Sequence, residues 1–298
     1  DFNSHQAGDE IPEQAYIDAL IRDLEQDLPL VWGRTIQTIF IGGGTPSLFS
    51  AEAYDRLFSA LRALLPIRAD AEITLEANPG TFEAARFTDY RAIGINRLSI
   101  GIQSFDGDSL TALGRIHDGK QAIRAAEIAH QAGFDNFNLD LMFGLPKQTA
   151  ELARKDVETA IALEPTHISY YQLTIEPNTL FHQSPPQLPD DEPIDNWQIA
   201  NQQRLAEAGY LQYEVSAYAK NGRQSRHNLN YWQFGDYLGI GAGAHSKLTS
   251  AATQSIERLV KQKQPQAYLD KVNSAQRVMK QEPVGINEIG FEFMLNAL

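Results

Sequence analysis

The sequence of 298 residues contains no cysteine, which excludes disulfide bonds and thiolate metal sites within it. It has no apolar run of about 18 residues, the length that crosses a membrane, and no basic-then-apolar signal segment at its start. Basic residues are scarce: 25 Lys and Arg stand against 38 Asp and Glu, for a net charge of −13. Nucleic-acid binders need a basic surface that displaces counterions. These absences predict a cytoplasmic protein with no transmembrane segment and no nucleic-acid partner.

Hydrophobic residues make up 43% of the chain, enough for one large α/β domain or for such a domain plus a small appendage. Short apolar runs alternate with longer amphipathic segments through the first 180 residues or so. The pattern predicts strands at Thr38–Ile41, Glu72–Leu75, Arg97–Gly101, Asn136–Leu141 and His167–Thr174, and helices at Ser50–Leu65, Phe82–Ile93, Lys120–Gln131 and Ala150–Leu163. Strands separated by helices pair in parallel through right-handed crossovers. The regular repetition favours a partial barrel over an open doubly wound sheet.

The composition changes at Gln183–Pro193, which is predicted to be a proline-rich and acidic surface segment. A helix is predicted at Asn196–Ala208, and strands at Leu211–Tyr218 and Leu238–Ala244. From Ser250 onward the chain is polar and helical in pattern, with no strand signal. The predicted parts are therefore a partial barrel over residues 1–182, a barrel-completing segment over 183–249, and the start of a smaller, mainly helical domain over 250–298.

Glycine and polar residues gather where the predicted parallel strands end, which is the face on which such barrels build their sites. Each residue taken alone also has a structural explanation, such as a tight turn, a helix cap or a solvated charge. Glu76 and Asp140 are the most informative, because a carboxylate in an apolar strand needs a partner. The full set is Gly43, Gly44, Thr45, Glu76, Gln103, Arg115 and Asp140.

Four strings at these positions resemble the HemW group of radical S-adenosylmethionine (SAM) proteins, relatives of oxygen-independent coproporphyrinogen III oxidase. They occur in the same order and at similar spacing, and the resemblance extends to about Lys247. The strings are Ile41–Ser47 (IGGGTPS), Leu75–Pro79 (LEANP), Ser99–Phe105 (SIGIQSF) and Asn138–Pro146 (NLDLMFGLP).

The resemblance implies a partial (β/α)6 barrel of the TIM type that holds SAM at the carboxyl ends of its strands. Gly43, Gly44 and Thr45 would then line the methionine amino group. The remainder of SAM would be held by Glu76, Gln103, Arg115 and Asp140, with Arg115 at the carboxylate, for which a guanidinium is suited. SAM offers an ammonium, a carboxylate and two ribose hydroxyls, and this set complements each of them.

The group also carries a Cys-x3-Cys-x2-Cys loop that binds a [4Fe–4S] cluster, and this sequence lacks those cysteines. Asp1–His5 (DFNSH) resembles the string that directly follows the third cysteine of the loop. We therefore expect the cluster cysteines just before Asp1. A paralogue without a cluster is the alternative. The residues present cannot bind the cluster or perform radical chemistry.

His227–Trp232 (HNLNYW) matches a His-Asn-x-x-Tyr-Trp signature that the resemblance associates with heme binding. The expected heme contacts are His227, Asn228, Tyr231 and Trp232. An imidazole can be an axial ligand of heme iron, and aromatic rings can stack on the porphyrin. His227 is the first candidate ligand and His245 the second. The ordinary alternative is a core histidine beside two packing aromatic residues.

Two functions follow from the resemblance. One is a heme chaperone that passes heme to acceptor hemoproteins, such as those of the respiratory chain. The other is an oxygen-independent coproporphyrinogen III oxidase, an enzyme that decarboxylates two propionates by radical chemistry. The His227 signature favours the chaperone, as does Asp1, since the oxidase carries a further cysteine close behind the third. The oligomeric state is left open.

Overall fold

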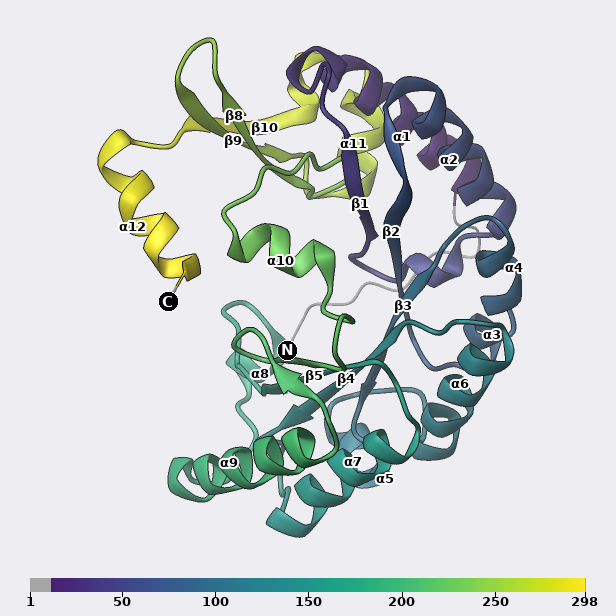
Figure 1. The fold of residues 1–298 in the computed structure, drawn as a ribbon, viewed down its shortest axis with the longest axis vertical. Helices are drawn as coiled ribbons and strands as arrows, with labels where there is room; N and C mark the ends of the chain where they lie inside the picture. The colour runs from purple at the N-terminus through teal and green to yellow at the C-terminus, as the bar shows by residue number, and fades with distance from the viewer. Residues whose placement is uncertain (1–11, 298) are drawn as a thin grey trace. The chain divides into compact units, whose positions relative to one another are not determined.

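A computed structural model describes residues 12–297 of the chain. The chain divides into two compact units, and Figure 1 labels many of their helices and strands. Of the described residues, unit 1 contains Phe40–Leu48 and Glu72–Ser225, and unit 2 contains 12–39, 49–71 and 226–297. The expectation about Asp1–His5 lies outside the described residues, and the predicted boundaries after residues 182 and 249 stay predictions.

A seven-stranded sheet has the strand order β1-β2-β3-β4-β5-β7-β6. Strands β2 to β5 pair in parallel, and β7 pairs with both β5 and β6 in the antiparallel sense. The α/β expectation with parallel strands is confirmed. The strands are β1 (Ile36–Ile41), β2 (Ile67–Ala77), β3 (Arg97–Gln103), β4 (Phe137–Phe143), β5 (His167–Gln172), β6 (Leu211–Gln212) and β7 (Ala217–Ala219).

Helices connect the parallel strands, as the sequence predicted. The side chain of Ser50 accepts a hydrogen bond from the backbone N–H of Ala53, so the predicted cap of the first connecting helix is confirmed. The helix expected over 82–93 is divided into two short helices, and the strand expected over 211–218 is the hairpin of β6 and β7. The helices are α2 (Ala51–Leu64), α3 (Thr81–Ala84), α4 (Phe87–Ala92), α5 (Gly107–Ala112), α6 (Gly119–Gln131), α7 (Ala150–Ala162), α8 (Leu180–Gln183) and α9 (Asp191–Glu207).

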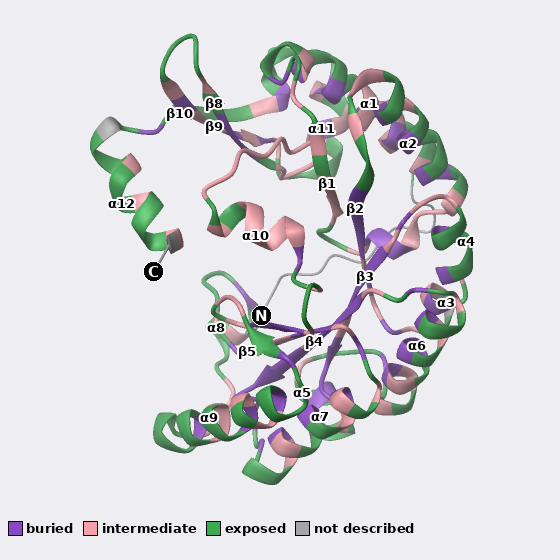
Figure 2. Cartoon of the chain, viewed as in Figure 1, coloured by how far each residue is buried: buried purple, intermediate pink, exposed green. Residues whose placement is uncertain are grey.

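Strands β3 and β4 of unit 1 are buried on both faces, which Figure 2 shows as purple ribbons. Leu98, Ile100 and Ile102 of β3 are fully buried. Side chains alternate between the two faces of a strand, so Arg97 and Ser99 lie on the opposite face and are also buried. One face of the sheet is therefore apolar, and the other buries polar groups that need partners.

Unit 2 contains a three-stranded antiparallel sheet of order β10-β9-β8. The prediction that no strand follows Ser250 was wrong, because β9 and β10 lie there. Both strands are rich in polar residues, and β10 is largely exposed, so their apolar signal is weak. The elements are α1 (Glu13–Asp27), α10 (Arg226–Trp232), β8 (His245–Ser250), β9 (Ser255–Lys261), α11 (Pro265–Lys271), β10 (Val278–Pro283) and α12 (Ile286–Ala297).

The strand predicted at 238–244 was also wrong, since β8 begins only at His245. A Cβ on Gly239 would lie 2.2 Å from the carbonyl oxygen of His245, so the glycine permits the backbone to approach itself closely. The segment is a tight turn and not a strand. Among the described residues, no helix is both long enough and apolar enough to cross a membrane.

Candidate functional site

The seven residues predicted to hold SAM all belong to unit 1. Gly43, Gly44 and Thr45 follow β1. Glu76 and Gln103 lie at the ends of β2 and β3, Asp140 lies within β4, and Arg115 follows α5. Since β2, β3 and β4 are parallel neighbours, their carboxyl ends share one edge of the sheet.

The glycine turn after β1 is tied to the carboxylate of Glu76 at the end of β2. The backbone N–H of Gly43 donates to Glu76 Oε2 at 3.0 Å. Gly43 and Gly44 have φ of 86° and 60°, a conformation that favours glycine. Burial raises the pKa of Glu76, and Asp140 adds to the rise, while the Gly43 N–H opposes it. The turn therefore brings the Gly43 backbone and the Glu76 carboxylate together.

Gln103 closes β3 in an uncommon conformation. Its φ is 69° and its side chain is buried. The hydroxyl of Tyr171, on β5, donates to Gln103 Oε1 at 3.0 Å. The pKa of Tyr171 is raised, first by burial and then by the charge of Asp140, while Arg115 opposes the rise. A non-glycine residue held at positive φ marks a site that the surrounding structure specifies closely.

Asp140 lies in the middle of β4 and is held by its neighbours. Asn138 Nδ2 donates to Asp140 Oδ1 at 2.7 Å, and the Ser99 hydroxyl donates to Oδ2 at 3.4 Å. Burial raises the pKa of Asp140, whereas the hydrogen bonds and the charge of Arg97 lower it. The Asp140 carboxyl is thus desolvated and only partly compensated, a common feature of binding sites.

Thr45 is half-buried, and its carbonyl accepts from the backbone N–H of Leu48 at 3.1 Å. Arg115 is less closely built into the arrangement. Arg115 is exposed and follows Gly114, whose φ is 69°. Its charge nevertheless affects two neighbours. It opposes the burial that raises the pKa of Tyr171, and it adds to the burial that lowers the pKa of His117. The His117 ring nitrogen is bonded to the carbonyl of Ile102 at 3.0 Å, so this histidine is a core residue of the turn.

Sequence reasoning missed a buried polar row on the same sheet face as Glu76. Glu76 is the register partner of Ser99, Ser99 of Asn138, and Asn138 of His167. The sequence predicted His167 only as the first residue of a strand. The signal that could have found the row is the recurrence of polar residues at alternate positions of β3, β4 and β5.

In unit 2, the signature residues form the short helix α10. The rings of His227 and Tyr231, four residues apart and so on one helix face, meet edge-on with centroids 4.9 Å apart. Tyr231 in turn meets Tyr237 at 4.8 Å. Burial raises the pKa of Tyr231. The result is an aromatic row that begins with an imidazole and reaches the surface at Tyr231, which is 39% exposed.

The remaining heme candidates differ in exposure. Asn228 and Trp232 are half-buried in α10. His245 is exposed at the first position of β8, where it pairs with Val260. The structure brings His227 and Tyr231 into contact, while His245 sits on a different element.

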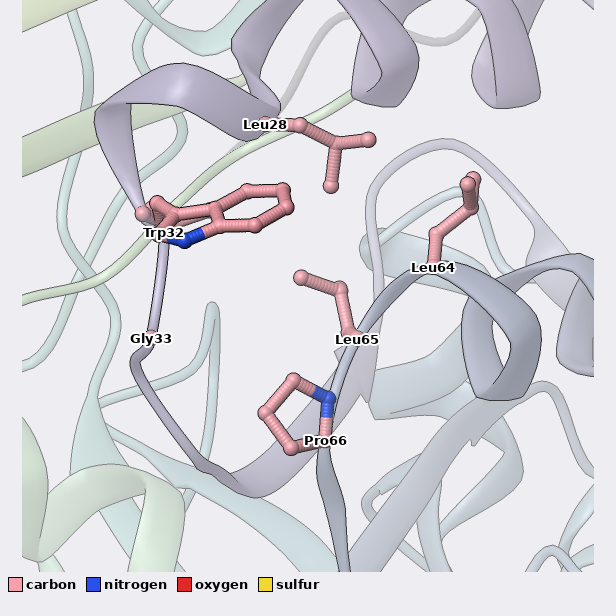
Figure 3. Close-up of a pocket in the computed structure, with 7 residues that line it drawn as sticks. Leu28, Trp32, Gly33, Leu64, Leu65 and Pro66 are labelled. Atoms are coloured by element: carbon pink, nitrogen blue, oxygen red, sulfur yellow. The ribbon is translucent and has the colours of Figure 1, made fainter.

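A separate hollow of about 260 Å³ lies in unit 2 (Figure 3). Its lining is apolar and includes Trp32, whose side chain is 84% exposed. No side chain in the lining can titrate or bind a metal, so the hollow contains no candidate catalytic or metal-binding group. The lining residues are Leu28, Val31, Trp32, Gly33, Leu64, Leu65 and Pro66.

Within residues 12–297, no three histidine or carboxylate side chains gather in a way that could hold a metal ion. The sequence itself supplies no cysteine. The side chains of the candidate site supply carboxyl groups from Glu76 and Asp140, an amide from Gln103 and a guanidinium from Arg115.

Comparisons with known proteins identify the family and the fold of the chain. Residues 10–160 match the model of the Radical SAM superfamily. The chain is 51% identical to the heme chaperone HemW of Escherichia coli and 51% identical to that of Haemophilus influenzae. Each match covers 99% of this chain and 77% of the relative. The solved structure of E. coli coproporphyrinogen III oxidase (HemN), described as a radical SAM enzyme, superposes with a TM-score of 0.82 at 24% identity, over 95% of this chain and 68% of that one. The α/β fold is thus the radical SAM fold seen in HemN, and the chain belongs to the HemW family of the radical SAM superfamily.

Proposed function

We propose that the protein is a heme chaperone, which binds heme at α10 and passes it to acceptor hemoproteins, such as those of the respiratory chain, in the cytoplasm. The observation that carries the proposal is the arrangement of His227 and Tyr231 on one face of α10, in a chain that is 51% identical to proteins named heme chaperone HemW.

The heme would lie against the aromatic row of α10. The His227 imidazole would be the axial ligand of the iron, and the Tyr231 ring would contact the edge of the porphyrin. Asn228 and Trp232 flank these two residues in the same helix. His245 is the second candidate ligand.

The residues of unit 1 fit SAM by their chemistry. Glu76 and Asp140 are desolvated carboxyls that can accept from an ammonium or from ribose hydroxyls. A Cβ on Gly42 would lie 2.9 Å from the carboxyl carbon of Glu76, so the glycine keeps this acceptor in place. Gly43, Gly44, Thr45 and Gln103 complete the proposed set, with Arg115 for the carboxylate of SAM.

Family membership implies a [4Fe–4S] cluster as well as SAM. The residues of this sequence do not fit the cluster, because none of the 298 is a cysteine. We derive no chemical step from it. Coproporphyrinogen oxidase activity is not proposed either, because the likeness to HemN at 24% identity shows the fold alone.

Heme titration tests the proposal. Hemin is added to the unaltered protein, to His227→Ala and to His182→Ala, a control at an exposed histidine of unit 1. We expect a saturable Soret shift at a fixed stoichiometry in the unaltered protein and the control, and its loss in His227→Ala. Transfer of the bound heme to an apo-hemoprotein, followed by absorbance, tests the chaperone step.

Two outcomes would contradict the proposal. Uptake that never saturates, or that is the same in all three proteins, would show adventitious hemin binding. Loss in His245→Ala with full binding in His227→Ala would move the ligand to β8.

A further inference from the structure

A buried chain of hydrogen bonds leads to the carboxylate of Asp140. His167 Nδ1 lies 2.7 Å from Asn138 Oδ1, and Asn138 Nδ2 lies 2.7 Å from Asp140 Oδ1. His167 Nε2 lies 2.8 Å from the Tyr213 hydroxyl, which accepts from the backbone N–H of Ser225 at 3.1 Å. Asn138 and His167 are 2% and 1% exposed, so water cannot replace these contacts.

The direction of every hydrogen bond in this chain follows from the chemistry of its ends. Asn138 Nδ2 and the hydroxyls of Ser99 and Ser169 all donate to Asp140, the pattern of a carboxylate that only accepts. Asn138 therefore turns its amide nitrogen toward Asp140. The second hydrogen of that nitrogen goes to the Ser99 hydroxyl at 2.8 Å. The amide oxygen of Asn138 therefore faces His167, and since an amide oxygen only accepts, His167 Nδ1 must carry a hydrogen.

The other ring nitrogen of His167 is fixed by the same reasoning. Burial and the charge of Arg97 lower the pKa of His167 well below its usual range, so the ring is neutral and Nε2 has no hydrogen. Tyr213 must then donate to Nε2. All donors point the same way, from the Ser225 amide toward Asp140, and such aligned bonds polarise one another.

We propose that His167 and Asn138 are positioning residues, which hold one oxygen of the Asp140 carboxylate through an Nδ1–H tautomer and so present the carboxylate to a hydroxyl-bearing ligand. The inference rests on the proposed SAM site, and the ligand class is the ribose of SAM. Without this hydrogen-bond chain, Asp140 Oδ1 would lose the Asn138 donor, and the Ser99 and Ser169 hydroxyls alone would hold the carboxylate.

Two substitutions of His167 separate positioning from packing. Asparagine places an amide N–H near the position of Nδ1, so His167→Asn retains the donor to Asn138. His167→Leu has similar bulk but no donor. SAM affinity is measured by equilibrium dialysis with radiolabelled SAM, in the unaltered background and in Asp140→Ala, and thermal unfolding of each variant verifies that it folds.

We expect His167→Leu to weaken SAM binding about fivefold, the effect of one lost hydrogen bond, and His167→Asn to recover most of the affinity. In the Asp140→Ala background neither substitution should weaken binding further, because a residue that acts through Asp140 has nothing left to position. An equal loss in both backgrounds would overturn the proposal.

Long-range ¹H–¹⁵N NMR of histidine-labelled protein gives a readout that does not depend on SAM. One ring should show a hydrogen on Nδ1 and none on Nε2, and its signal should disappear in His167→Asn. The Nε2–H tautomer at His167 would overturn the proposal. SAM binding that is unaffected by Asp140→Ala would instead contradict the proposed SAM site, while the tautomer still decides the hydrogen-bond chain.

Discussion

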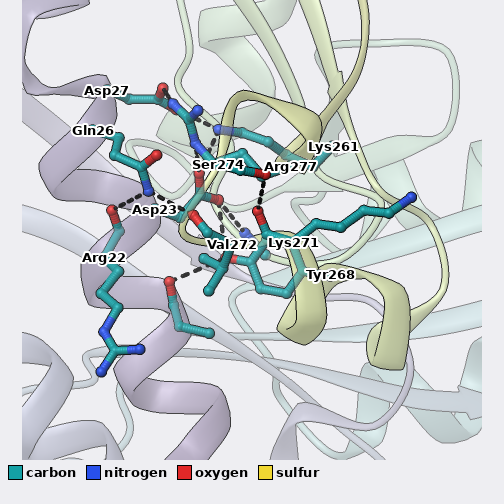
Figure 4. A network of polar contacts seen from close by, with 12 residues as sticks. Arg22, Asp23, Gln26, Asp27, Lys261, Tyr268, Lys271, Val272, Ser274 and Arg277 are labelled. Atoms are coloured by element: carbon teal, nitrogen blue, oxygen red, sulfur yellow. Dashed lines mark hydrogen bonds and ion pairs between the residues drawn. The ribbon is translucent and has the colours of Figure 1, made fainter.

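The two units bury polar groups in opposite ways. Unit 2 buries four charges that balance: Asp23 and Asp27 of α1 face Lys261 of β9 and Arg277, which directly precedes β10 (Figure 4). Lys261 Nζ lies 2.5 Å from Asp23 Oδ1, and Arg277 Nε lies 2.9 Å from the same oxygen. We call these four residues the buried quartet.

In unit 1, Asp140 and Glu76 are half-buried, and hydrogen bonds from neutral groups are their main compensation. Asp140 receives hydrogen bonds from neutral groups, and its pKa is raised by burial. Burial also raises the pKa of Glu76. The charges of the quartet are therefore compensated within the protein. The carboxyls of unit 1 would be stabilised by a ligand that donates hydrogen bonds to them. Carboxyls whose pKa is raised in this way are candidates for a binding site.

The largest expected effect comes from removing one cation of the quartet. Lys261→Met leaves two buried carboxylates with Arg277 alone, and breaking a buried pair costs about 3–5 kcal/mol. The free energy of unfolding from urea titration measures the loss. Arg68→Ala is the control, since Arg68 and Asp70 form an exposed pair and its removal should change nothing measurable. A loss in Lys261→Met no larger than in this control would show that the quartet is not a structural element.

Asn138→Leu should have the next largest effect, because it breaks the network of unit 1 at its centre. The Nδ1–H of His167 and the hydroxyl of Ser169, which donates to Asn138 at 3.1 Å, would lose their acceptor. An unsatisfied buried donor costs about 1–3 kcal/mol, measured by thermal unfolding. Asn196→Leu, at an exposed position of α9, is the matched control. Equal melting temperatures for the two variants would contradict the network.

How far the sequence could predict these regions depends on the range of the contacts. Glu76 and Asp140 were predicted because a carboxylate in an apolar strand stands out locally, and Ser50 because a cap is set by the next three residues. The quartet could not be predicted, since Asp23 and Lys261 are 238 positions apart and each looks like an ordinary surface charge. The strands β9 and β10 were missed for a related reason: their pairing and not their composition makes them strands.

Gly42→Ala tests whether the glycine turn matters for binding more than for stability. The new Cβ would lie 2.8 Å from the Phe40 ring and 2.9 Å from the Glu76 carboxyl carbon, so the flexible Glu76 side chain must move away from the Gly43 N–H. We expect about tenfold weaker SAM binding, the effect of losing a hydrogen bond to a charged group, with little change in melting temperature. Gly107→Ala is the control, because nothing lies within 4 Å of its Cβ. Unchanged SAM affinity in Gly42→Ala would remove Glu76 from the site.

The smallest expected effect is a pH dependence that belongs to His167. Its pKa is lowered in the folded protein, so the unfolded chain, with a pKa of about 6.5, binds the proton more readily. Stability from this group is present above about pH 6.5 and is lost as the pH falls from there toward the folded pKa. Asp156, whose pKa burial raises to about 6, has the opposite sign, because there the folded state holds the proton. Since Asp156 is the same in both proteins, the difference in unfolding free energy between the unaltered protein and His167→Gln, followed from about pH 7.5 down to about pH 5, isolates His167. As the pH falls, the unaltered protein should lose unfolding free energy relative to His167→Gln. A difference that is constant with pH would mean that the imidazole is not held neutral.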